Sequence, residues 1–127
     1  MELEIEIETF DKKLDFDLFE AKERFERGME TKIAEGVLAR YERTEGHLAV
    51  GFADVIHFAI TIGRNTAIGL VSGIISDWLY DKLKERNVEK LRIERTQVEI
   101  DRSQIERIIT EKMETTNARA HTKQMTS

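Results

Sequence analysis

Apolar residues alternate with glutamates at the start of the chain. Leu3, Ile5 and Ile7 fall on odd positions. The even positions hold a row of four glutamates: Glu2, Glu4, Glu6 and Glu8. A period of two is typical of a strand with one buried and one solvated face, so we predict a strand over residues 2–9. We interpret the glutamate row as a solvated edge of the sheet, because charges along an edge oppose pairing with other molecules.

The next segment changes to helical spacing. Asp17 and Glu20 have the spacing of a capping box, in which side chains bond the free backbone N–H groups that begin a helix. The apolar residues that share one helical stripe here are Leu18, Ala21, Phe25 and Met29. We therefore predict a helix from Asp17 that ends between Gly28 and Gly36. A brief alternation just before it leaves open a short strand over residues 14–18.

Large apolar residues occupy the even positions from Leu48 to Ile62, with Asp54 as the exception. The odd positions hold mostly small or polar side chains, and this pattern predicts extended structure. A strand of that length would span about 50 Å, so we expect a bend or bulge near Asp54. Residues 37–41 alternate in the same way before a turn at residues 44–46, which predicts a hairpin into this run.

A broad apolar stripe from Ala67 to Leu83 predicts a helix over residues 66–86, with Asn65 or Thr66 as its cap. The opposite side carries small residues where a surface helix usually carries Lys and Glu: Gly69, Ser72, Gly73 and Ser76. Together with Tyr80, these residues are the predicted interaction surface. The alternative is intramolecular, in which the small odd-position residues of the 48–62 run accept this side of the helix.

The last third of the chain predicts a hairpin and a helix. A turn at Arg95–Thr96 would pair Ile93 with Val98 and Leu91 with Ile100, which places all four apolar residues on one face. The apolar residues that then predict an amphipathic helix are Ile105, Ile108, Ile109 and Met113. Apolar periodicity ends near Thr116, so residues 116–127 are predicted to be a disordered tail.

The order of these elements predicts a single α+β domain over residues 1–115. Neighbouring strands are joined by short turns, which favours an antiparallel sheet. We expect about five to six strands, with a single layer of three helices packed on the sheet.

Composition narrows the class of protein. The chain has 127 residues, 40% hydrophobic and 35% charged, which suits an ordered, soluble domain. It has no cysteine and an acidic N-terminal segment, so we expect neither a disulfide framework nor secretion, and place it in the cytoplasm. A formal charge of -5 argues against nucleic acid as a partner, because that affinity depends on Lys and Arg.

Asp54 and His57 are the candidate polar site, since a carboxylate can orient an imidazole for general-base work. On an extended strand, however, residues three apart point to opposite faces. We therefore favour an aspartate at a bulge and an ordinary, partly buried histidine. No phosphate loop or nucleophile elbow occurs in the sequence. We expect no catalytic residues, no metal site and no cofactor.

The favoured function is a non-catalytic protein-interaction or self-assembling module, in the form of a small homo-oligomeric accessory or regulatory protein. Its basis is the surplus of apolar and small-residue surface, which a second subunit or another protein would cover. One alternative is a small membrane-active effector that uses the apolar 48–80 region, although a membrane is the less favoured partner because charges interrupt this region. A second alternative is an enzyme of unknown class.

Overall fold

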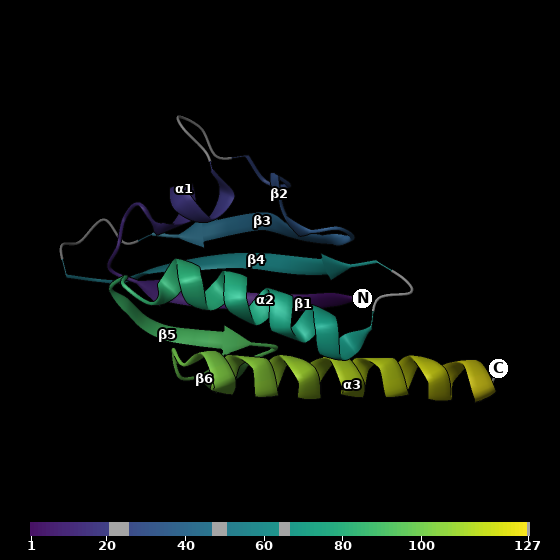
Figure 1. The fold of residues 1–127 in the computed structure, drawn as a ribbon. Coiled ribbons are helices and arrows are strands. Elements are labelled where there is room, and N and C mark those ends of the chain that lie inside the picture. The colour runs from purple at the N-terminus through teal and green to yellow at the C-terminus, as the bar shows by residue number, and fades with distance from the viewer. Residues whose placement is uncertain (21–25, 47–50, 64–66, 127) are drawn as a thin grey trace.

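The computed structural model describes the backbone of residues 1–20, 26–46, 51–63 and 67–126, and the side chains in these ranges up to Thr116. Within them lie a six-stranded antiparallel sheet and three helices, so the predicted α+β fold is confirmed (Figure 1). The elements in chain order are β1 (Glu2–Thr9), α1 (Leu14–Phe19), β2 (Glu30–Ala34), β3 (Val37–Glu45), β4 (Asp54–Ile62), α2 (Ile68–Leu83), β5 (Val88–Ile93), β6 (Thr96–Val98) and α3 (Arg102–Thr126).

The first strand lies in the middle of the sheet. The strand order is β2-β3-β4-β1-β5-β6, and Ile5 of β1 lies opposite Phe58 of β4 on one side and Ile93 of β5 on the other. The interpretation of the glutamate row as a sheet edge was therefore wrong, because β1 inserts between two strands that come later in the chain. The alternation itself is confirmed, since the apolar side chains of β1 are fully buried.

One hydrophobic core joins the sheet to the helices. Phe58 of β4 lies edge to face with Phe19 of α1 and with Trp78 of α2, at ring-centroid distances of 5.6 and 6.2 Å. Buried residues of α2 and α3, such as Ile75 and Ile109, belong to the same cluster. Figure 1 shows α1 and α2 across one side of the sheet, with α3 alongside α2. The opposite side of β1, β4 and β5 carries no described helix.

Residues 14–36 differ most from the prediction. The predicted helix begins and ends at the wrong residues, because α1 occupies Leu14–Phe19 and ends at Glu20, whose φ of 53° is left-handed. The same helix excludes the short strand that was left open over residues 14–18. Ala21 and Phe25 of the predicted stripe lie outside the described residues. Gly36, with φ 75°, then supplies the turn of an unpredicted hairpin between β2 and β3.

The run of even-position apolar residues forms β4, which begins at Asp54, where a bend was expected. Its even side chains from Ile56 to Ile62 are buried, and its predicted hairpin with β3 is confirmed. Phe52 precedes the strand and is 56% exposed. Leu48 and Val50 lie outside the described residues.

The hairpin between β5 and β6 exists, but its predicted register was wrong. The turn consists of Glu94 and Arg95, both at positive φ (48° and 68°), so Leu91 lies opposite Val98 and Ile93 opposite Thr96. A two-residue turn with both φ values positive matches the right-handed twist of the strands, and this sequence adopts it without glycine. The observed register differs from the predicted one by an even number of residues, so the same side chains still point to the core.

Helix α2 matches its predicted position, although its ends are shorter, and the predicted caps Asn65 and Thr66 lie outside the described residues. Helix α3 runs to Thr126, so its backbone passes through the segment expected to be a tail. No glycine or proline interrupts the sequence there. In Figure 1 this end of α3 extends past the rest of the fold. Disorder of residues 116–127 in solution stays a prediction.

Candidate functional site on the helix-free face of the sheet

The sheet presents a largely charged surface on the side away from the helices, which we call the polar sheet face. Its members are the outward residues of β1, β3, β4 and β5. They are Glu2, Glu4, Glu6, Glu8, Leu38, Arg40, Arg43, Glu45, Val55, His57, Ala59, Thr61, Lys90 and Arg92. They share this face because side chains alternate along each strand, and a bulge between Tyr41 and Arg43 resets the alternation of β3.

His57 lies at the centre of this face and faces carboxylates on two neighbouring strands. Its Nδ1 lies 3.5 Å from Oε1 of Glu6 on β1, and its Nε2 lies 3.2 Å from Oε1 of Glu45 on β3. The imidazole is 12% exposed, and Nε2 has no hydrogen-bond partner among the described residues. A neutral imidazole carries one N–H, so it can donate to one of these carboxylates at a time. The imidazole on β4 therefore lies between a carboxylate of β1 and a carboxylate of β3.

Ion pairs connect the acidic row of β1 to cations on both sides. Arg92 of β5 lies 3.0 Å from Glu8 and 3.5 Å from Glu6, and Arg40 of β3 lies 3.0 Å from Glu2. The Arg40–Glu2 pair is exposed and the Arg92 pairs are partly buried, and surface pairs of this kind each add about 0 to 1 kcal/mol to stability. Their main effect here is to hold the charged rows in place across the sheet.

A shallow hollow of about 230 Å³ lies beside His57 on the same face. Its polar walls come from Glu4, Glu6, Glu42, Arg43, His57 and Arg95. Charges of both signs surround the imidazole, so the hollow suits a polar group of a partner better than an apolar ligand.

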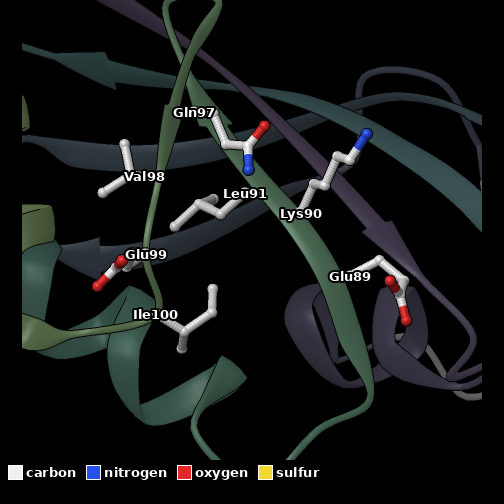
Figure 2. A pocket seen from close by; sticks show the side chains of 7 residues that line it. All are labelled: Glu89, Lys90, Leu91, Gln97, Val98, Glu99 and Ile100. Carbon is white, nitrogen blue, oxygen red and sulfur yellow. The ribbon is translucent and has the colours of Figure 1, made fainter.

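A second hollow, of about 440 Å³, lies where β5 and the segment after β6 separate. Figure 2 shows the two segments diverging, with Glu89, Lys90 and Leu91 on one and residues 97–100 on the other. Pairing stops at Leu91 and Val98 because the chain turns into α3, with the N–H of Asp101 donating to the carbonyl of Glu99. The hollow follows from this change of direction and brings together no nucleophile and base.

The structure separates the two residues of the candidate polar site. Asp54 shares the helix-side parity of Ile56, and its carboxylate accepts a hydrogen bond from Nζ of Lys12 at 2.8 Å. His57 points to the polar sheet face. The prediction that this pair points to opposite faces agrees with these positions, and His57 instead meets carboxylates that are distant in sequence.

Sequence reasoning missed a polar network near Asp54. The Thr44 hydroxyl donates to Asp15 at 3.1 Å and lies 2.7 Å from the Tyr41 hydroxyl. Burial raises the pKa of Asp15 above its ordinary value, although the hydrogen bond from Thr44 opposes this. No local pattern could have shown the network, because α1 and β3 meet through tertiary packing.

Helix α3 covers much of the predicted interaction surface. Ser72 and Ser76 are fully buried, and the Ser72 hydroxyl lies 3.6 Å from the sulfur of Met113. A Cβ atom on Gly73 would lie 3.7 Å from Arg102 of α3. The small residues therefore contact a helix of the same chain, whereas the intramolecular alternative named the 48–62 run as the partner. Gly69 is exposed and Tyr80 is half-buried, and contact of this group with another molecule stays a prediction.

The described residues offer neither a metal site nor a membrane-spanning helix. No group of three or more His, Asp or Glu side chains in the described part of the chain could hold a metal ion. None of the described helices combines the length and apolar character needed to cross a membrane. Compared with protein-family models, curated proteins and solved structures, the chain matches none of them.

Proposed function

We propose that this chain is a non-catalytic interaction module that binds another protein chain through the polar sheet face. The observation that carries the proposal is the central position of the β1 glutamate row, with cations on the strands to either side. A buried sheet face would be apolar, and a merely solvated face does not require rows of charge held by cross-strand pairs. Fixed charges of both signs select one partner over others and guide its orientation.

The arrangement favours binding over catalysis. The titratable groups at the centre of the face lie against one another, as His57 does between Glu6 and Glu45. A catalytic group would instead point toward a site where a substrate atom could sit within hydrogen-bond reach.

The face is also a better contact surface than the two edges of the sheet. Edge strand β2 carries Glu30 and Lys32 and has an irregular register between Lys32 and Ala34, and β6 has three residues. Charges, bulges and short length all oppose the addition of another strand. A protein is the expected partner because the acidic row would repel the phosphates of a nucleic acid.

Charge reversal tests the proposal. The face variant combines Glu4→Lys and Glu8→Lys, and the matched control combines Glu111→Lys and Glu114→Lys on exposed positions of α3. We expect the parent and the control to capture the same protein from native extract, and the face variant to lose it while its circular-dichroism melt stays cooperative. Equal capture by all three chains would contradict the proposal.

A further inference from the structure

We infer that the partner of the polar sheet face is a second copy of this chain, with the acidic row of β1 in one copy opposite the basic row of β5 in the other. This inference rests on the proposed function and names its partner. It is carried by the order of the charged rows and by the charge balance of the face.

The acidic and basic rows are adjacent and in register. Glu6 lies beside Arg92, and Glu8 beside Lys90, on neighbouring strands β1 and β5. Arg92 pairs with both glutamates, whereas Lys90 is exposed and has no ion pair among the described residues. An acidic strand beside a basic strand is the simplest pattern that can complement itself.

A two-fold axis within the interface, running along the gap between β1 and β5, turns one face onto the other and exchanges these rows. Glu6 then lies opposite the second copy's Arg92, and Glu8 opposite the second copy's Lys90. The same operation repeats both contacts, as a two-fold interface requires. Packed sheets cross at about 30°, so Glu4 at the end of the row moves away from the second copy's turn.

The charge of the whole chain favours this face as the contact. The protein carries a formal charge of -5, so two copies repel one another overall. On the polar sheet face, with Glu42 and Arg95 of the hollow included, six glutamates lie among five cations: Arg40, Arg43, Lys90, Arg92 and Arg95. The net acidic charge therefore lies mostly elsewhere, so two copies meet less repulsion at this face than their net charge implies.

The area suits a weak, transient dimer. With the axis between β1 and β5, strands β1 and β4 lie over β5 and β6 of the second copy, and strand spacing and residue rise give an overlap of roughly 300 Å² per copy, in the range of transient contacts. Charged side chains fill its centre, where tight interfaces are usually apolar. We therefore expect a reversible dimer that weakens as salt is added.

Sedimentation velocity of the full chain at low and high salt is the first measurement. We expect a dimer at high-micromolar concentration in about 20 mM salt and a monomer in about 500 mM salt, because salt screens the contacts between rows. Salt also screens the repulsion between acidic chains, so a dimer held by apolar contacts would strengthen instead. The direction of the salt effect therefore identifies the kind of contact.

Row-swap variants give the decisive result. The acidic-row variant carries Glu6→Lys and Glu8→Lys, and the basic-row variant carries Lys90→Glu and Arg92→Glu. Each is expected to be a monomer, because like charges then oppose one another, and an equimolar mixture is expected to restore the dimer mass. Glu8→Lys and Lys90→Glu, each as a single substitution, repeat the test with less disturbance of the pairs around Arg92.

Two results would overturn the inference. One is a monomeric parent at low salt throughout the concentration range, and the other is a dimer that persists in both row-swap variants. If the parent is monomeric but the face still captures a different protein from extract, the inference fails and the proposed function survives. If the parent is monomeric and the face captures no other protein, both the inference and the proposed function are rejected.

Discussion

The carbonyl oxygen of Gly73 on α2 accepts a hydrogen bond from Nη2 of Arg102 on α3, at 3.3 Å. The same guanidinium pairs with Asp77 on α2 and with Glu106 on α3. Arg102 therefore lies over the small-residue side of α2 and links the two helices. A side chain added at Gly73 would have to share this space.

Substitutions at Gly73 test this contact. Gly73→Ala should stabilise the fold by up to about 1 kcal/mol, because alanine favours helix and its Cβ would make ordinary contacts at 3.7 and 3.8 Å. Gly73→Leu should instead cost about 1 to 3 kcal/mol, since it displaces Arg102 and Glu106. Urea unfolding measures both effects.

Gly69 provides the matched control for that measurement. It lies on the same helix, and nothing lies within 4 Å of a Cβ at this position among the described contacts. Gly69→Leu should therefore leave the free energy of unfolding unchanged or raise it. If Gly73→Leu and Gly69→Leu give the same stability, α3 does not restrict the space at Gly73.

Asp15 and Asp11 should show opposite dependences on pH. Burial raises the pKa of Asp15 in the folded protein above its value in the unfolded chain. Once the pH rises above the unfolded pKa, the ionised Asp15 side chain therefore lowers the stability of the folded state. Asp15→Asn should accordingly stabilise the protein at pH 7, with the gain fading in acid. Thermal melts between pH 3 and 8 measure it, and a destabilised variant at pH 7 would contradict the role of burial.

Asp11 should show the opposite dependence on pH, because its pKa is lowered in the folded protein. Burial acts to raise its pKa, but the backbone N–H of Lys13 and the guanidinium of Arg86, at 2.9 Å each, outweigh burial and lower it. Asp11 therefore stabilises the fold at pH values above its pKa in the unfolded chain, and this contribution is lost as the pH falls through its lower pKa in the folded protein. Asp11→Asn should cost on the order of 1 kcal/mol at pH 7, and this loss should shrink in acid. A loss that does not change with pH would exclude the ion pair as its source.

His57 should prove structural. His57→Gln keeps a polar side chain between Glu6 and Glu45, so we expect a change in unfolding free energy of about 1 kcal/mol or less and unchanged capture of the partner. His57→Leu is the harsher comparison, because it leaves both carboxylates facing an apolar group. Complete loss of a cellular activity in His57→Gln, with folding and assembly intact, would instead indicate imidazole chemistry.

Truncation tests the boundary of the domain. Met113 is buried, whereas the exposed residues Glu114 and Thr115 follow it. Deleting residues 117–127 should leave the melting temperature within a few degrees of the parent. Deleting residues 112–127 removes Met113 and should cost about 2 to 4 kcal/mol. Equal losses from both deletions would show that the final segment contributes to the folded domain.

Local periodicity was sufficient to predict the elements that have one apolar face along their whole length. Strands β1 and β4 and helix α2 were predicted from the sequence because burial of that face imposes a period of 2 or 3.6 on the residues themselves. The same reasoning failed around α1, where Leu14 and Leu18 satisfy a helix over one turn and a strand over five residues equally well. So short a segment does not distinguish the two periods.

Tertiary structure decided what lies against each face. The sequence showed that Gly73 and its neighbours suit close contact, but not that α3 of the same chain would contact Ser72 and Gly73. Nor could it place β1 at the centre of the sheet or bring Glu6 and Glu45 to the two sides of His57. These relationships depend on strand order and long-range pairing, and a residue pattern records that a face is buried without recording what buries it.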